Sequence, residues 1–318
     1  MVKKMKLAAV VIWYNPKSFE ESTKKVLSYS HCAEKVYIVD NSSVDNSALT
    51  KEIPNAVYIP NLKNLGIAEA QNIGCQRALE DGFEWAMTMD QDSSFDSGVL
   101  EKYIELSENH TKEDQKSASF SLSMKDDSKN ILPLSVQAKK KLKAFLIKHL
   151  NFSFPPPKER EPIDHPDRCY ASGNIINLLV WSRIGKFDSS LFIDEVDFDF
   201  CIRLLLNGYI ITRFNTISIN HKLGNRKITL FPKCSYHTGK RLFFIIRNKL
   251  IENKRYRTAI KLEHDYRKEI FQYFKDYCIF DIKAFTNLII FIKAFRAYKE
   301  FIKNDPTYQN LKEKGLAK

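Results

Sequence analysis

Short apolar runs and amphipathic segments alternate along the first third of the chain. Residues 6–12, 36–39, 56–59 and 83–89 are apolar runs with the length and the β-branched content of buried strands. Between them, residues 16–28 and 67–81 carry the spacing of helices, and Gly82 marks the end of the second. Strands that alternate with helices predict a mainly parallel sheet covered by helices on both faces.

The pattern becomes irregular between residues 107 and 167. This stretch combines polar runs, a basic amphipathic piece and the break Pro155-Pro156-Pro157. The sequence therefore predicts a loop-rich insertion within one domain of residues 1–232.

Regular patterning returns after the insertion. An apolar run at residues 175–181 precedes a helix whose apolar stripe consists of Phe198, Cys201, Ile202 and Leu205. Short strands are expected at residues 210–212 and 217–219, and the chain beyond residue 236 has a helical pattern.

Charge divides the chain into two regions. Residues 233–318 hold 20 Lys and Arg against 9 Asp and Glu, and the whole chain has a formal net charge of +12, so the first 232 residues are nearly neutral. A basic, aromatic-rich C-terminal region indicates a surface that meets an anionic partner. Two interpretations of residues 233–318 remain open: contact with an anionic membrane surface, or an ordinary helical subdomain or homodimer interface with a solvated basic face.

Composition excludes several classes of protein. The six cysteines are scattered without a C-x-x-C pair, which argues against a structural zinc site and a disulfide scaffold and is typical of a cytoplasmic protein. The apolar stretch at residues 288–292 is far shorter than the roughly 20 residues that span a bilayer, so no integral membrane protein is expected.

Two carboxylates follow the fourth expected strand, in Asp90-Gln91-Asp92. In a loop both can face one hard cation and leave positions open for phosphate oxygens. A turn with capping aspartates would have the same residues without any metal. The carboxyl ends of parallel strands are where such sheets bind ligands, which favours the metal interpretation.

A second acidic cluster lies at the start of a helix. Residues 194–199 hold four carboxylates in six positions. Capping by Asp194 and the helix dipole account for one or two of them. Crowded like charges raise one another's pKa, which suits a general base, so a catalytic role is the competing interpretation.

His221 follows the last expected strand and is either structural or a metal ligand, since neutral imidazole is a common ligand. The segments Asn64-Leu65-Gly66 and Asn72-Ile73-Gly74 offer backbone N–H groups near a helix N-terminus, where a diphosphate is stabilised. Neither segment matches a dinucleotide-binding or P-loop pattern.

In their order and spacing these motifs resemble the family 2 glycosyltransferases with the GT-A fold, within them the bacterial rhamnosyltransferase-like group. The similar motifs are VIWYNP, VDNSS, NLGIAEAQNIG, MDQDSS, SGN, FIDEVDFDFCIR, GY and HKLG, which extend over about residues 5–225, with a weaker match in RLFFIIRNK. The resemblance implies a Rossmann-like, mixed but mainly parallel α/β sheet, followed by a basic helical extension.

The resemblance also implies roles for individual residues. The implied donor-binding residues are Tyr14, Asn15, Asp40, Asn41, Asn64, Gly66, Asn72, Asp90 and Gln91. Asp92 and His221 would bind Mg²⁺ or Mn²⁺, and Asp197 falls at the position of the general base. The implied supporting or acceptor-contacting residues are Gly173, Asn174, Asp194, Glu195, Asp199 and Arg203. Where the family often has Glu-Asp the chain has Val196-Asp197, so Asp194 and Glu195 remain alternative bases.

The implied activity is inverting transfer of a sugar from a nucleotide-diphosphate sugar to a glycan or a lipid-linked acceptor in cell-surface polysaccharide synthesis. By the same resemblance dTDP-rhamnose is the first expected donor, and UDP-galactofuranose or another UDP-hexose is the alternative. Cytoplasmic location, with peripheral contact to the inner face of the membrane, fits this activity. A nucleotidyltransferase would place a Gly-rich loop with Arg or Lys where the chain has WYNP. A nucleic-acid-binding protein leaves the carboxylate clusters unexplained, and a non-catalytic sugar-binding protein is the other alternative.

Overall fold

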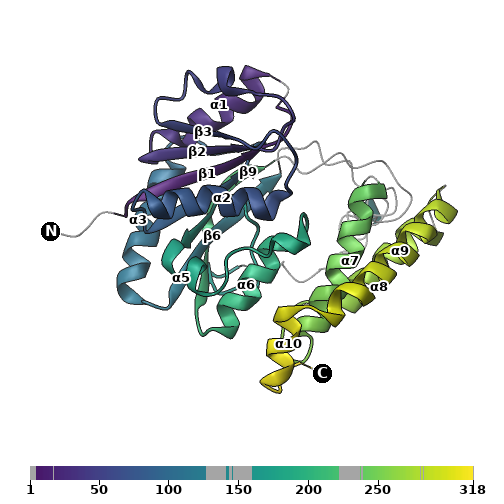
Figure 1. Cartoon of the computed structure of the whole chain (residues 1–318). Helices are drawn as coiled ribbons and strands as arrows, with labels where there is room; N and C mark the ends of the chain where they lie inside the picture. Colours follow the sequence, from purple (N-terminus) through teal and green to yellow (C-terminus); the bar gives the residue numbers. More distant parts are fainter. Residues whose placement is uncertain are drawn as a thin grey trace.

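The computed structural model describes residues 5–16, 18–126, 141–142, 145, 160–221, 237, 239–279, 281 and 283–317. A mixed sheet forms the centre of the N-terminal region, with the strand order β3-β2-β1-β4-β8-β6-β9-β5 and with β7 paired to β9 (Figure 1). The strands are β1 (Leu7–Trp13), β2 (Lys35–Asp40), β3 (Ala56–Pro60), β4 (Trp85–Asp90), β5 (Ser93–Ser94), β6 (Ser117–Asp126), β7 (Ile163–Asp164), β8 (Asn174–Asn177) and β9 (Ile210–His221). The α/β class expected from the sequence is confirmed.

The half of the sheet from β3 to β4 is parallel, and helices bury both of its faces. All seven residues of β1 are buried, as expected for a strand covered on both sides. One face packs against α1 (Phe19–Ser30) and α3 (Val99–Glu113). The other packs against α2 (Ile67–Glu80), α5 (Leu178–Arg183) and α6 (Val196–Leu206).

Close packing of α2 on the sheet requires a glycine. A Cβ atom at Gly74 would lie 2.4 Å from Cγ1 of Val10. The helix can therefore approach β1 only because this position has no side chain.

The other half of the sheet is mixed, and it differs from several expectations. β8 is antiparallel to both β4 and β6, whereas β6 is parallel to β9. The prediction of irregular chain from residue 107 is wrong for the described part, because α3 continues to Glu113 and β6 follows. Apart from residues 141–142 and 145, the basic piece lies outside the described residues, and so does the Pro155-Pro156-Pro157 break.

Three predicted element boundaries also change. The strands expected at residues 210–212 and 217–219 are one strand, β9, which keeps its pairing with β6 through a register shift. The apolar run at residues 175–181 divides into the end of β8 and the start of α5, where Asn177 caps the helix. The first helix begins at Phe19, because Ser18 accepts a hydrogen bond from the backbone N–H of Glu21 and acts as its N-cap.

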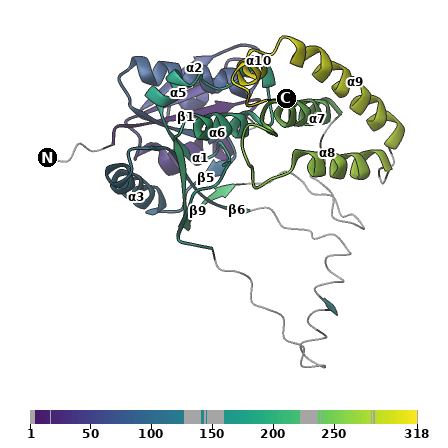
Figure 2. The same ribbon diagram turned by 90° about the horizontal axis from the view of Figure 1, so that it is seen from below.

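Helices make up the described C-terminal part of the chain and lie together beside the sheet (Figure 2). They are α7 (Gly239–Tyr256), α8 (Tyr266–Phe274), a π-helical turn at Lys275–Ile279, α9 (Ala284–Lys303) and α10 (Pro306–Glu313). Among the described residues, no helix is both long and apolar enough to cross a membrane.

A buried ionic network joins these helices to α6. Arg255 of α7 is 1% exposed and bonds to Asp199 of α6 at 3.0 Å and to Asp305 before α10 at 2.7 Å. Tyr256 donates a hydrogen bond of 2.6 Å to the same oxygen of Asp199. The charges of Arg255, Asp199 and Asp305 are thus paired with one another, as burial requires.

Candidate active site

The ends of two strands bring three predicted ligands together. Asp90 ends β4, Asp92 lies two residues later, and His221 ends β9, which pairs with β5 so that Ser93 lies opposite His221. One carboxylate oxygen each of Asp90 and Asp92 and one ring nitrogen of His221 lie within 4.8 Å of one another. His221 lies 131 positions after Asp90 and 129 after Asp92, yet the three residues form one cluster, which we call the metal-site cluster.

The chemistry of the metal-site cluster fits a divalent cation. Within the described part of the chain, Oδ1 of Asp92 is buried and accepts no hydrogen bond, and its ionic neighbour is Nδ1 of His221 at 3.4 Å. A buried carboxylate oxygen without a hydrogen bond is costly, and a cation would satisfy it. Burial and the charge of Asp92 raise the pKa of Asp90 to about 6, and these effects outweigh the opposite effects of His221 and Arg241.

Two serines that the sequence analysis missed hold this cluster in place. Ser93 Oγ lies 2.7 Å from Nδ1 of His221, and Ser172 donates a 2.6 Å hydrogen bond to Ser93. The backbone N–H of Asp90 donates to Ser172 at 3.3 Å. Partners of this kind orient metal ligands. The only sequence signal for them was their place beside the Asp90–Asp92 and Gly173-Asn174 motifs.

Asp197 lies in the first turn of α6, close enough to Asp90 for the two charges to interact. Its Oδ2 accepts a 3.1 Å hydrogen bond from the backbone N–H of Ala171. Burial, helped by the charge of Glu195, raises its pKa to about 7. A carboxyl group with such a pKa can accept a proton near neutral pH.

The two alternative bases, Asp194 and Glu195, each form an ion pair. Asp194 is paired with Arg241 of α7 at 2.9 Å, and buried Glu195 is 2.6 Å from Nζ of Lys249. The expectation that Asp194 caps α6 is wrong, because Glu195 occupies the N-cap position and makes no side-chain cap bond. Both residues have positive φ angles, of 64° and 65°, as does Phe192 at 66°. Such strain in residues 192–195 is the kind that clusters at functional sites.

Most predicted donor-binding residues lie at the ends of β1, β2 and β4. The backbone N–H of Tyr14 donates a 2.8 Å bond to Gln91, and that of Asn15 donates a 2.7 Å bond to Ser42. Both Tyr14 and Asn15 are exposed, so a ligand can reach them.

Asp40 and Asn41 are buried within this region instead of facing outward. Asp40 accepts hydrogen bonds from the backbone of Ser42, from Asn46 and from Tyr58. Asn41 donates to the carbonyl of Gly66. Both side chains hold the loops after β2 and β3, which is a positioning role.

The turn before α2 contacts the loop before α6. Gly66 has a φ of 85°, and a Cβ there would lie 2.6 Å from Phe192. Asn64 accepts a hydrogen bond from the N–H of Gly66, and the N–H of Ile67 donates to the carbonyl of Phe192 at 2.7 Å. The turn that was expected to face a diphosphate therefore packs against residues 192–195.

Other predicted site residues have structural contacts. Asn72 exchanges hydrogen bonds with the backbone of Phe187. Asn174 accepts a bond from Ser119, and Gly173 has a φ of 77° and accepts from Tyr103. These contacts stabilise the sheet and the chain before α6.

Asp199 and Arg203 also point into the protein. Arg203 bonds to Asp199 at 2.7 Å and to the carbonyls of Ile184 and Lys186. The family-like motif of α6 thus divides between Asp197, whose charge interacts with that of Asp90, and two residues that anchor the helix.

Arg241 is a further residue whose role the sequence did not indicate. Its charge acts on Asp90 while its guanidinium pairs with Asp194, so it lies on the side of the site formed by α7. The only sequence signal for this segment is the weak match of RLFFIIRNK. The contact between Arg241 and Asp194 joins residues 47 positions apart, so no local pattern indicates it.

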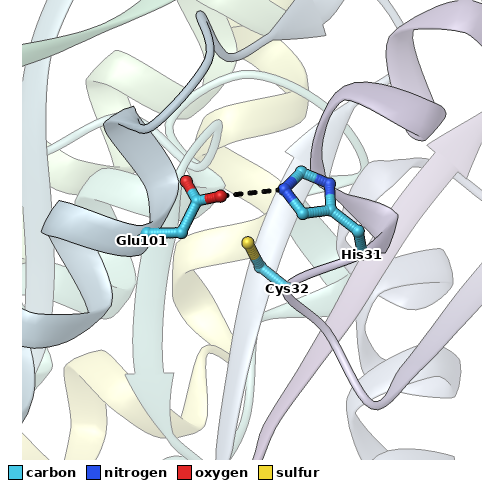
Figure 3. A group of neighbouring side chains, drawn as sticks. All are labelled: His31, Cys32 and Glu101. Carbon is cyan, nitrogen blue, oxygen red and sulfur yellow. Dashed lines mark hydrogen bonds and ion pairs between the residues drawn. The ribbon is translucent and has the colours of Figure 1, made fainter.

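A second group of potential ligands lies between α1 and α3 (Figure 3). His31 Nε2 is 3.0 Å from Oε1 of Glu101, with Cys32 beside them. The His31 and Glu101 side chains are both more than half exposed. A solvated hydrogen bond that links the two helices accounts for the His31–Glu101 contact.

Comparisons with known proteins agree with the motifs and the fold. The family model described as Glycosyl transferase family 2 matches residues 8–150. The dTDP-rhamnosyl transferase RfbF of Shigella flexneri is 26% identical over 244 residues, which cover 76% of this chain and 77% of that protein. The resemblance stated from the motifs is therefore confirmed.

Solved structures share the fold at low identity. GalNAc-T7 with UDP, GalNAc and Mn²⁺ superposes with a TM-score of 0.55 at 10% identity, over 98% of this chain and 58% of that one. TarS of S. aureus gives 0.52 at 13% identity over 95% of this chain, and a TarS 1-349 complex with UDP-GlcNAc gives 0.53 at 12% over 92% of this chain and 80% of that one. The chain spans only 49% of the longer TarS structure. These likenesses identify the fold as GT-A.

Proposed function

We propose, from the premise that the chain is a glycosyltransferase of the family 2 kind, that it transfers a sugar with inversion from a nucleotide-diphosphate sugar and depends on a divalent cation. The observation that supports this most directly is the convergence of Asp90, Asp92 and His221 within 4.8 Å, near a carboxylate at Asp197 that forms no ion pair with any described residue. A leaving diphosphate needs positive charge, and an attacking hydroxyl needs a base.

In the proposed mechanism Asp197 receives the proton of the acceptor hydroxyl. The hydroxyl oxygen attacks the anomeric carbon, and the bond from that carbon to the diphosphate breaks on the opposite side. Asp92 and His221, with Asp90 beside them, would hold Mg²⁺ or Mn²⁺, which neutralises the leaving diphosphate when bound. Asp194 and Glu195 are poorer bases, because each is already paired with a cationic side chain.

Donor identity is proposed from the relative. We propose dTDP-rhamnose first, because RfbF is a dTDP-rhamnosyl transferase, and a UDP-sugar second, because the TarS structure holds UDP-GlcNAc. Exposed Tyr14 and Asn15 offer contacts for the nucleotide at the ends of the parallel strands.

A thermal-shift panel tests the donor. We expect dTDP-rhamnose with Mn²⁺ to raise the melting temperature more than UDP- or GDP-sugars do, since a ligand that binds only the folded state stabilises it. The matched control repeats the panel with Asp92→Asn, in which the metal-dependent part of the shift should disappear. A panel in which no nucleotide sugar raises the melting temperature would contradict the proposed function.

We also propose that the acceptor is lipid-linked and is met at an anionic membrane surface. The helix α9 carries an exposed apolar stripe at Phe285, Leu288, Ile289, Ile292 and Phe295. Exposed Lys293, Arg296 and Lys299 lie on the same helix, and exposed Lys283 precedes it directly. An amphipathic basic helix of this kind binds membrane interfaces.

An apolar groove between α7 and α9 adds to this argument. Its volume is about 390 Å³, and its lining consists of Gly239, Lys240, Phe243, Phe244, Ile290 and Lys293. Arg241, which pairs with Asp194 beside α6, follows Lys240 directly. The groove would take the apolar part of an acceptor whose phosphate meets the two lysines.

Flotation with liposomes tests this surface. We expect the protein to float with phosphatidylglycerol vesicles at low salt, and the double variant F285S/I292S to lose at least about tenfold in binding, since two exposed apolar side chains no longer enter the interface. The control V44S/L179S removes two apolar side chains that are similarly exposed elsewhere and should float normally. If the wild type stays at the bottom and F285S/I292S instead dissociates a dimer, the stripe is a protein interface.

A further inference from the structure

A cavity with no role in the mechanism so far opens beside the segment that holds Asp197. Its volume is about 360 Å³, at the lower end of the roughly 300–1,000 Å³ typical of small-molecule sites. It is formed by the chain before β8, the start of α6, strands β6 and β9, and the turn between α7 and α8. Tyr170 and Ser172 line it on either side of Ala171, whose N–H binds Asp197.

One wall of the cavity is aromatic. Tyr170 is 58% exposed, and its ring centroid lies 5.5 Å from that of Phe198, the residue after Asp197. The guanidinium of Arg168 covers Phe198 at 4.7 Å. Exposing a large aromatic side chain to water is unfavourable, and a planar ring beside polar groups suits a ligand with one apolar and several polar edges.

The two arginines that line the cavity are paired with carboxylates. Arg213 makes two bonds to Asp164, at 2.9 and 2.6 Å. Arg168 contacts Glu269 at 3.2 Å and Nε2 of His264 at 2.6 Å. Burial and the neighbouring Arg168 lower the pKa of His264, which keeps its ring neutral. Both arginines that line the cavity thus have carboxylate partners, and a phosphate would have to compete with them.

We propose that this cavity is the acceptor-sugar subsite, and that it binds a neutral, hydroxyl-rich glycosyl residue with its C–H face on Tyr170. This inference rests on the proposed function. The hydroxyl of the bound sugar gives its proton to Asp197, and its oxygen forms the new bond to the anomeric carbon. The diphosphate leaves with the electron pair of the bond that breaks. The acceptor is then recognised by the sugar already present on it, and the lipid part lies elsewhere.

Saturation-transfer NMR with methyl glycosides tests the subsite without any donor. The probes are methyl α-rhamnoside, methyl β-galactofuranoside, methyl β-glucoside and methyl N-acetyl-β-glucosaminide. We expect at least one to receive saturation from the wild-type protein, and Tyr170→Ala to weaken its binding roughly tenfold or more, because the stacking surface is lost. Tyr170→Phe, which keeps the ring, should retain most of the binding.

The control Phe271→Ala removes a ring of similar exposure, 61%, from α8 and should bind the glycosides normally. In Tyr170→Ala the thermal shift by the donor should stay at the wild-type level, because donor binding does not require the acceptor. The inference is overturned if no glycoside binds the wild type, or if Tyr170→Ala binds them as well as the wild type does. Failure of every nucleotide sugar to bind would instead contradict the proposed function. The NMR measurement contains no donor, so it tests the acceptor subsite separately from the proposed function.

Discussion

Replacing Asp197 with asparagine is expected to lower the turnover number roughly a hundred- to ten-thousand-fold, the range that one general base contributes. Asparagine keeps the size of the side chain and the hydrogen bond from Ala171, but it cannot accept the proton of the acceptor hydroxyl. Donor binding should change little. Initial rates of transfer and the thermal shift by the donor measure the two effects separately.

The pH profile gives a second readout of the same carboxylate. A base must be deprotonated to act, so the turnover number should rise with pH and level off once Asp197 has ionised. The pKa of Asp197, about 7, is the highest pH expected for the midpoint of the rising limb. A bound cation would move this midpoint to lower pH, because positive charge favours the ionised carboxylate. The rising limb should be absent from the residual activity of Asp197→Asn.

Glu105→Gln is the matched control, since it makes the same acid-to-amide change on an exposed turn of α3. Its turnover and its pH profile should equal those of the wild type. Wild-type turnover in Asp197→Asn would remove the residue from the role of base and direct attention to Glu195.

Removal of divalent cations is expected to abolish transfer, and Mn²⁺ or Mg²⁺ to restore it. In Asp92→Asn and His221→Ala the concentration of Mn²⁺ that gives half-maximal activity should rise about a hundredfold or more, since even second-shell changes cost 10- to 100-fold. The structural reason is that Asp92 Oδ1 and a ring nitrogen of His221 face each other across the site with no hydrogen-bond donor for Asp92 Oδ1 among the described residues.

Direct binding of Mn²⁺, followed by its electron paramagnetic resonance signal, separates ligand loss from loss of catalysis. Ser93→Ala should weaken binding less than His221→Ala, because it removes only the group that orients the imidazole. Full activity of the wild type in the presence of a strong chelator would rule out the proposed cation.

Periodicity predicted the parallel half of the sheet closely, because three of its strands, β1, β2 and β4, are buried on both faces and read as continuous apolar runs. β6 was missed for a physical reason. Its sequence, SASFSLSMKD, alternates serine with apolar residues, and it lies next to polar segments that suggested a loop. Its pairing with β9 joins residues about 95 positions apart, which no local pattern reveals.

The metal-site cluster could be foreseen because its residues follow strand ends and the carboxyl ends of a parallel sheet form one edge. The sequence could not predict the ion-pair partners that distinguish Asp194 and Glu195 from Asp197. Arg241 and Lys249 lie on α7, about 50 residues later, and only the folded chain shows that they engage the first two carboxylates and leave the third. Similarly, Asp40 and Asn72 have family-like positions, yet their hydrogen bonds stay within the protein.

Asp199 is bonded both by residues of α7 and by Arg203 of α6, which limits how far the sequence of the terminal helices can change independently of α6. One of its oxygens binds Arg255 and Tyr256 of α7 and the other binds Arg203, so the first turn of α6 is held from both sides. Leaving a buried charge without its partner costs roughly 3–5 kcal/mol. A graft that exchanged the terminal helices for those of another transferase would therefore disturb the proton acceptor itself, unless it supplied an arginine and a tyrosine at the same two places. The placement of the first turn of α6, which carries Asp197, thus depends on contacts made by the terminal helices.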